Sequence, residues 1–213
     1  FLFILTLTIS LIYYFSNLHR IKNKEKSKKI ISFSAGVSVT YVLLELFPTF
    51  TEMALSINKL IFISLPIGFI THHIIEKEIY KHSTRYELKR MLSLEENIFS
   101  FVYHVVIGVV LVNFVTQNYI QSILFFIPLA SYTFLNNLPT HPHTSKMKSV
   151  LLSSATTIGA AFGLGLGKFI TPALQSSLIG IITGVLLFAI IRHHIPFGKK
   201  GKIGYFTVGF LIY

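Results

Sequence analysis

A single histidine stands inside the apolar stretch FSFVYHVVIGVV, residues 99–110. An imidazole at membrane depth is costly, and by default it marks a functional site. His104 can ligate a metal ion, carry a proton, or make one hydrogen bond to a neighbouring helix. Tyr103 is adjacent, but consecutive side chains on a helix diverge by about 100°. The two residues therefore do not form one site by themselves.

Other polar side chains inside the apolar stretches are few. Glu45 is the only carboxylate within a predicted membrane span, and the chain contains neither aspartate nor cysteine. Glu45 either faces an outer vestibule or serves as an entrance ligand or proton site. Asn113 and Asn136 are candidates for a transport path, although such amides usually make hydrogen bonds between helices.

The composition is that of a polytopic membrane protein. Of the 213 residues, 52% are hydrophobic and only 13% are charged, and the mean hydropathy is +0.66. A net charge of +11 would suggest nucleic acid in a soluble chain. Here we attribute it to basic loops at a membrane, so the expected partner is the lipid bilayer and not nucleic acid. No hydrolase motif is present, and we do not expect an enzyme.

Eight apolar stretches have lengths near that of a membrane span, and each must be helical to satisfy its backbone in lipid. The sequence thus predicts one all-α membrane domain, residues 1–213, with eight transmembrane helices. The predicted spans are residues 1–16, 30–49, 58–75, 97–116, 119–138, 149–167, 174–192 and 203–213.

Basic residues alternate with the predicted spans. Four alternate loops, residues 19–29, 76–90, 141–148 and 192–202, carry 17 of the 19 Lys and Arg residues. The positive-inside rule then predicts that these loops are cytoplasmic and that both termini lie outside the plasma membrane. His72 and His73 fall at such a span end, where they lie among lipid headgroups or form a weak metal or proton-sensing cluster.

The second and seventh predicted spans resemble each other. SAGVSVTYVLLELFP (34–48) and ITGVLLFAIIRHHIP (182–196) share the spacing from glycine to proline, and this register sets Glu45 opposite His193. The spans that follow contain IGF (67–69) and VGF (208–210). The two halves cross the membrane in opposite senses, so spans 1–3 and 6–8 are predicted to form an inverted repeat around spans 4 and 5. Glycines at 159, 163 and 167 predict a close helix contact in the sixth span.

These same segments resemble the ZIP (Zrt/Irt-like protein) family of divalent metal transporters. AGVSVTYVLLELFP (35–48) is similar to the family's second span, LLSSATTIGAAFGLGLG (151–167) to its sixth, and residues 183–213 to its seventh and eighth. The resemblance implies eight spans with both termini outside. It also implies Zn²⁺ or another divalent cation as a substrate, and transport by alternating access.

The metal-binding segments depart from the family pattern. Its fourth span usually reads His-Asn-x-x-Asp-Gly, where this chain has YHVVIG (103–108). Its fifth usually reads His-Glu-x-Pro-His or His-Asn-x-Pro-Glu, where this chain has FFIPL (125–129) and only Pro128 matches. A rival register, NNLPTH (136–141), lies at the cytoplasmic end of the span. His104 stands at the usual Asn position and remains the main candidate metal ligand.

Two functions therefore remain open from the sequence. The chain is a ZIP-like divalent metal transporter with most usual ligands replaced. Alternatively it is a ZIP-derived membrane scaffold, partner subunit or sensor without transport, or it transports a different substrate through the same frame. A homodimer or a partner membrane protein is a possible assembly in either case.

Overall fold

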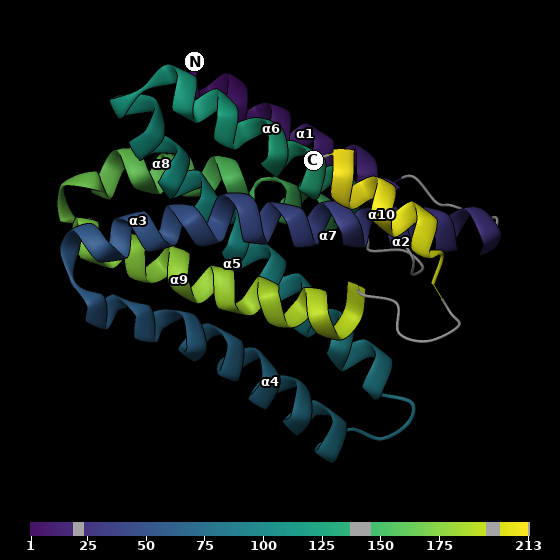
Figure 1. The fold of residues 1–213 in the computed structure, drawn as a ribbon. Helices are drawn as coiled ribbons and strands as arrows, with labels where there is room; N and C mark the ends of the chain where they lie inside the picture. The colour runs from purple at the N-terminus through teal and green to yellow at the C-terminus, as the bar shows by residue number, and fades with distance from the viewer. Residues whose placement is uncertain (19–23, 137–145, 195–200, 213) are drawn as a thin grey trace.

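The computed structural model describes residues 1–18, 24–136, 146–194 and 201–212 (Figure 1). Within these ranges the chain is helical apart from short connections and contains no strand, which confirms the all-α class. The elements are α1 (Leu2–Leu18), α2 (Lys24–Tyr41), η1 (Val42–Leu46), α3 (Phe47–Ile57), η2 (Lys59–Ile63), α4 (Ser64–His82), α5 (Leu88–Gln117), α6 (Tyr119–Asn136), α7 (Lys146–Ser153), α8 (Ala155–Leu166), η3 (Gly167–Phe169), α9 (Pro172–Ala189), η4 (Ile190–His194) and α10 (Ile203–Ile212).

Several described helices are able to cross a membrane. Four are long and apolar enough by themselves, and the bent pair α7–α8 gives a fifth crossing if it is counted as one span. Three further apolar helices, of 10–17 residues, fall on the predicted first, fifth and eighth spans. The membrane class predicted from composition thus agrees with the fold, at the level of four or five spans.

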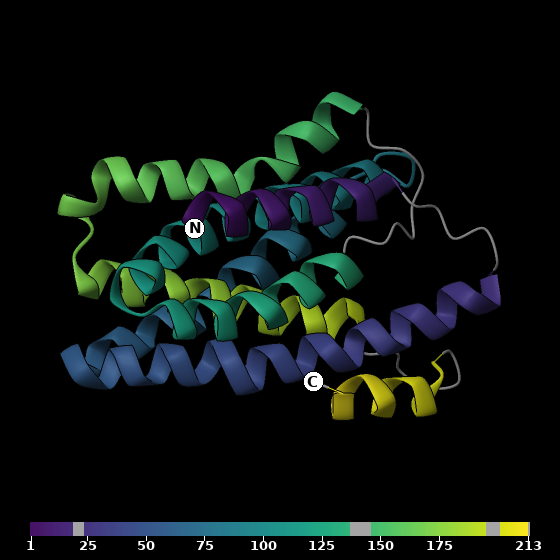
Figure 2. The ribbon, with the colours of Figure 1, turned by 90° about the horizontal axis from the view of Figure 1, so that it is seen from above.

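The helices run along one common direction (Figure 2). The described ends of the helices that flank the four basic loops lie at the same end of the bundle, which we call the basic end. The start of α1 lies toward the opposite end. In both views α2 and α10 run in one direction, and α4 and α9 run in the other.

Two helices contain a π-helical turn, at Val42–Leu46 and at Ile190–His194. Pro48 follows the first of these turns and stands in the opening turn of α3. Proline lacks the backbone N–H that a helix interior uses, and the π-helical turn directly before it interrupts the regular α-helical bonding at that point. The helical rod therefore continues from α2 through η1 and α3 to Ile57, well past the predicted end of the span at residue 49. Pro196, the matching proline of the second half, lies outside the described residues.

Three helix pairs cross at glycines with one shared local geometry: α2 with α10, α4 with α9, and α5 with α8. In each pair, a Cβ on either glycine would overlap the carbonyl oxygen of the residue three positions before the other glycine. Small residues allow such close backbone approach between membrane helices. The glycine pairs are Gly36 with Gly209, Gly68 with Gly184, and Gly108 with Gly159.

The small-residue stripe of the sixth span is in part a helix contact. Gly159 and Gly163 lie against α5, but a Cβ on Gly167 would meet nothing within 4 Å. Gly167 begins the short turn η3 after α8 has ended. The span itself bends by 42° between α7 and α8. Ser153 and Ser154 stand at the bend, and their hydroxyls bond back to carbonyls of the preceding turn, which favours bending.

Two helices are longer than the sequence predicts. α4 continues to His82 instead of ending near residue 75, and α5 begins at Leu88 instead of near residue 97. Hydropathy ends a span at its first charged residues, whereas here Glu76 and Glu95 are buried between helices and their segments stay helical. Polar side chains at the basic end are thereby brought into the packed interior.

Candidate functional site

A central aromatic cluster occupies the position where the resemblance implies a metal site. It consists of Tyr13 of α1, Tyr41 of α2, Tyr103 and His104 of α5, and Tyr132 of α6. All five side chains are buried, with at most 3% of each residue exposed. Sequence reasoning named two of them and missed the other three, because an apolar pattern does not show which helix faces which.

His104 has a partner for each ring nitrogen. Its Nδ1 donates to the Ser100 carbonyl oxygen at 2.7 Å, and its Nε2 lies 3.4 Å from the Thr133 hydroxyl. The carbonyl can only accept, whereas the hydroxyl can donate. A neutral imidazole with its proton on Nδ1 therefore satisfies both contacts. The ring also packs edge-on against Tyr13, with centroids 5.0 Å apart.

Tyr103 points into a second part of the cluster. Its hydroxyl lies 3.0 Å from the hydroxyl of Tyr41, and the Tyr41 ring stacks on that of Tyr132 with centroids 5.1 Å apart. Three helices, α2, α5 and α6, are joined by these contacts. Tyr103 and His104 touch as an edge-to-face pair, although their polar atoms bond to different neighbours.

Apolar side chains fill the other positions of the metal motif. Ile107, Phe125 and Leu129 are each 2% exposed or less, and Phe114 packs on Phe125. In the part of the chain that the structure describes, no three His, Cys, Asp or Glu side chains are grouped so that they could hold a metal ion. The polar groups of the central aromatic cluster are tyrosine hydroxyls and one imidazole, which form hydrogen bonds among aromatic rings.

The remaining candidate residues lie apart from this centre. Glu45 stands in the π-helical turn η1 and is half-buried. Asn113 donates from Nδ2 to the Gln175 side-chain oxygen at 2.6 Å, which joins α5 to α9. Asn136 is the last residue of α6, and its side chain is outside the described part. Most of the rival motif, residues 137–141, also lies outside the described residues.

A second polar group lies at the basic end, and we call it the basic-end cluster: His72 and Glu76 of α4, Glu95 of α5 and Arg192 of η4. His72 Nε2 lies 3.3 Å from Glu95 Oε1, with both side chains almost fully buried. Glu76, with a side chain that is 4% exposed, pairs with Arg192 through Oε1 and Nε at 3.2 Å. The two contacts connect α4 to α5 and to the helical turn η4 that follows α9.

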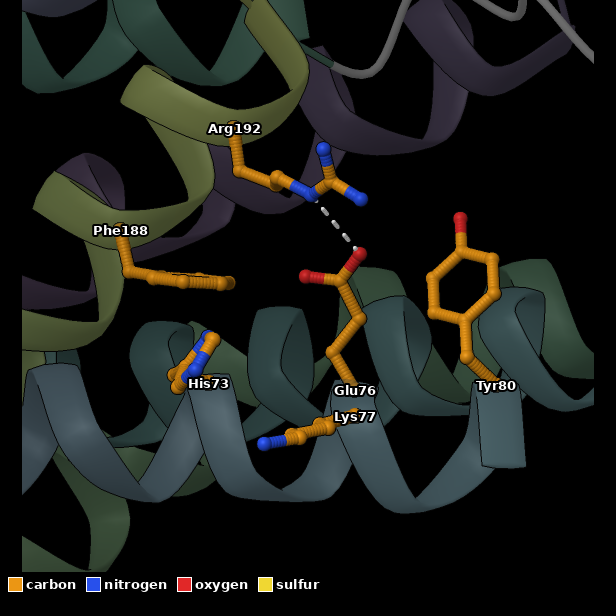
Figure 3. Close-up of a pocket in the computed structure, with 6 residues that line it drawn as sticks. All are labelled: His73, Glu76, Lys77, Tyr80, Phe188 and Arg192. Atoms are coloured by element: carbon orange, nitrogen blue, oxygen red, sulfur yellow. Dashed lines mark hydrogen bonds and ion pairs between the residues drawn. The ribbon is translucent and has the colours of Figure 1, made fainter. Parts of the chain in front are cut away.

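A surface pocket of about 450 Å³ adjoins this cluster. Figure 3 shows His73, Glu76, Lys77 and Tyr80 along α4, facing Phe188 and Arg192 from the neighbouring helix. The Phe188 ring also packs on His72, with centroids 4.8 Å apart. The pocket thus reaches Glu76 directly and is separated from His72 by one aromatic side chain.

The sequence contained one signal for the basic-end cluster. His72 and Glu76 stand four residues apart, and such residues share one face of a helix. Interpreting residues 76–90 as a charged loop obscured this signal, and starting the fourth span at residue 97 left Glu95 outside the predicted helices. Nothing in the local pattern indicates that Arg192 reaches Glu76, because 116 positions separate them.

Comparison with protein-family models and with curated proteins finds no match to this sequence.

Proposed function

We propose that this chain is a ZIP-like membrane protein in which two inverted halves, spans 1–3 and 6–8, surround the helices α5 and α6. The observation that carries this proposal is the agreement between the helix pairs α2–α10 and α9–α4. In each pair the long helix begins its π-helical turn six residues after its crossing glycine, at Val42 after Gly36 and at Ile190 after Gly184. The partner glycines, Gly209 and Gly68, are the aligned glycines of VGF and IGF.

The opposite directions of the two pairs support an inverted relation (Figure 1). Shared glycine spacing alone could arise by chance. Here the spacing, the crossing contacts and the π-helical turns coincide in one register. Inverted repeats of this kind are a common frame for secondary transporters, which move one helix group against the other. The basic end is then the cytoplasmic end, and both termini face outward, as the loop charges predict.

A transporter that uses this frame is the first candidate function, with divalent cations as the substrate class that the family resemblance implies. Its central site would work with His104, Tyr103 and the surrounding hydroxyls, since the usual carboxylate positions hold apolar residues. Neutral ligands alone compensate poorly for desolvating a doubly charged ion. Transport of a substrate with less charge fits this centre better than transport of Zn²⁺.

A second candidate function is a membrane scaffold or partner subunit without transport. The observation that favours it is the direct bond between Tyr41 and Tyr103, which closes α2 onto α5 where a substrate would pass. Ile107, Phe125 and Leu129, each of which is 2% exposed or less, fill neighbouring positions of this interior. Such a core stabilises one conformation, which suits a scaffold.

Uptake into proteoliposomes separates the two functions. The purified protein is reconstituted, and uptake of Zn²⁺, Mn²⁺ and Fe²⁺ is followed beside His104→Ala, Glu45→Gln and the exposed-site control Tyr86→Phe. Saturable uptake that is lost in His104→Ala and retained in Tyr86→Phe supports a metal transporter. Intact, helical protein with no uptake above empty liposomes contradicts metal transport and leaves the scaffold or another substrate.

A further inference from the structure

His72 is held between three helices. It stands on α4, its Nδ1 lies 3.2 Å from the Val185 carbonyl oxygen of α9, and its Nε2 lies 3.3 Å from Glu95 Oε1 of α5. Its ring is covered by Phe99 and Phe188, with centroids at 4.2 and 4.8 Å. Only 5% of the residue is exposed, so both ring nitrogens take these groups as their near neighbours.

Both of these neighbours are acceptors. A backbone carbonyl never donates, and a carboxylate donates only when it is protonated. A neutral imidazole carries one N–H, so with an ionised Glu95 one ring nitrogen would hold a lone pair within 3.2–3.3 Å of an oxygen that cannot donate to it. One additional proton removes this conflict, either on the imidazole or on the carboxyl group. His104 provides the contrast, because its second neighbour is the Thr133 hydroxyl, which can donate.

The burial of Glu95 is a second reason to expect an additional proton at this contact. Its side chain is 4% exposed, and its Oε1 accepts no hydrogen bond from any described residue. The His72 ring is the one cation-forming group recorded against that oxygen in the described chain. A buried carboxylate without compensation is strongly unfavourable. A proton shared with His72 makes the pair neutral overall.

We propose that His72 and Glu95 form a buried proton-binding pair, which holds one exchangeable proton between α4, α5 and α9. The ligand of this site is the proton itself. The assignment rests on the acceptors around His72 and on the burial of Glu95. It holds whether the chain transports a substrate or not.

The charged groups around the pair come from α4, α5 and the helical turn η4. On α4 itself, His73 and Lys77 are exposed and Glu76 is buried. The helix that follows α9 contributes Arg192, which is engaged by Glu76, and α5 contributes the exposed Glu96 beside Glu95. Because Arg192 compensates Glu76, the carboxylate of Glu95 depends on His72 for its compensation.

The surface pocket lies next to the His72–Glu95 pair. Glu76 lines the pocket and stands one helical turn from His72 on the same face of α4 (Figure 3). Phe188 separates the pocket from the imidazole. Loss of the proton would leave a net negative charge between α4 and α5. Since α4 packs mainly on α9 and α5 packs mainly on α8, we expect the smaller contact between α4 and α5 to loosen.

Nitrogen NMR of the full-length protein in lipid nanodiscs tests the pair. Histidines are labelled with ¹⁵N, and His72 is identified by the signals that disappear in His72→Gln. The spectrum is taken at about pH 8, above the ordinary titration range of histidine. The matched control is His82, which pairs with Glu78 at 3.0 Å but with both side chains more than half exposed.

We expect His72 to carry protons on both nitrogens at this pH, and the exposed His82 provides the reference spectrum of a histidine beside a solvated carboxylate. In Glu95→Gln, His72 should lose one proton, because the amide can donate to Nε2. If the proton resides on Glu95 instead, His72 shows a single N–H and the infrared band of a protonated carboxyl group disappears in Glu95→Gln.

The proposal is overturned by one result: wild-type His72 with a single N–H and no protonated carboxyl band assignable to Glu95. The wild-type nitrogen spectrum shows how many protons His72 carries, and sequential assignment identifies the residue where His72→Gln does not fold. The carboxyl band is assigned to Glu95 with Glu95→Gln or, where that variant does not fold, with Glu95→Asp, which keeps a carboxyl group and shifts the band.

Discussion

Gly68 of α4 and Gly184 of α9 pack against each other's backbone, and a Cβ on either one would overlap a carbonyl oxygen of the other helix. The contact lies where the two helices cross, and no flexible side chain is available to move aside. Close packing of this kind is the main force between membrane helices, because lipid offers no hydrophobic drive for association. The two helices are therefore held at a separation that only glycine permits.

Gly184→Ala should destabilise the protein by about 1–3 kcal/mol, the usual cost of overpacking a well-packed interior. The added methyl group forces α4 away from α9, and the contacts on both sides of the crossing are lost. Thermal unfolding in detergent, followed by circular dichroism, measures the effect.

Gly165→Ala is the matched control for this substitution. A Cβ on Gly165 would meet nothing within 4 Å, and alanine is the better helix former by roughly 0.5–1 kcal/mol. The control should therefore leave the melting temperature unchanged or raise it. Equal destabilisation by both substitutions would show that glycine matters for a reason other than the crossing.

The hydroxyl groups of Tyr41 and Tyr103 should be energetically coupled. Replacing either residue by phenylalanine removes the hydrogen bond between the two hydroxyls and leaves the other hydroxyl buried, whereas the double replacement removes both hydroxyls. We expect a coupling energy of about 0.5–1 kcal/mol in a double-mutant cycle, the range of hydrogen bonds between membrane helices.

Tyr86→Phe serves as the control, since Tyr86 is 96% exposed and should change stability by less than about 0.5 kcal/mol. Additive effects of the two core substitutions would contradict the 3.0 Å contact between their hydroxyls.

Local pattern was sufficient to predict the helical class and the close helix contact of Gly159 and Gly163. An apolar run of span length must be helical in lipid, and the spacing of small residues predicts that contact, whereas the crossing role of Gly108 was not predicted. The contacts of Tyr103 could be predicted from sequence spacing only in part. Spacing sets Tyr103 and His104 on different faces of α5, but the partner Tyr41 depends on how α2 packs.

Burial of charged residues was beyond what the sequence pattern could predict. Glu76 and Glu95 stand in a segment rich in charge, and such segments are usually solvated loops. Whether a carboxylate there is exposed depends on contacts with residues far along the chain, such as Arg192 with Glu76. The lengths of α4 and α5 follow from the same contacts, which explains why both helices were predicted too short.

The ion pair between Glu76 and Arg192 should respond unequally to removal of its two partners. Arg192→Gln leaves a buried carboxylate without its guanidinium, whereas Glu76→Gln leaves a cation that is 55% exposed and can be hydrated. Loss of one partner from a fully buried pair costs 3–5 kcal/mol. The exposure of Arg192 reduces this to roughly 1–3 kcal/mol for Arg192→Gln.

Chemical denaturation at low and high salt measures both variants, with Lys77→Gln as a control from the same pocket. A larger loss in Glu76→Gln than in Arg192→Gln would argue against the burial of the carboxylate.

The start of α5 should depend on pH through Glu87. The hydroxyl and the backbone N–H of Thr84 both donate to Glu87 Oε2, at 2.8 and 3.3 Å. These hydrogen bonds lower the pKa of the Glu87 carboxyl group below its ordinary value, the side-chain bond contributing most. A lowered pKa means that the folded chain favours the ionised form. The stabilisation is therefore complete above the ordinary glutamate pKa and is lost as the pH falls through the lowered value.

Hydrogen exchange at the backbone amides of residues 88–91 checks this pH dependence. Protection there should decrease below about pH 4, once intrinsic exchange rates are corrected for. In Thr84→Ala the Glu87 carboxylate loses its hydroxyl donor, and the Glu87 backbone N–H loses the Thr84 oxygen that accepts from it. The protection should therefore already be low at neutral pH. Glu78→Gln, which removes an exposed carboxylate from the end of α4, should leave the amides of α5 unchanged. Protection that stays constant between pH 3 and pH 7 in the wild type would contradict a role for the ionised Glu87 in starting the helix.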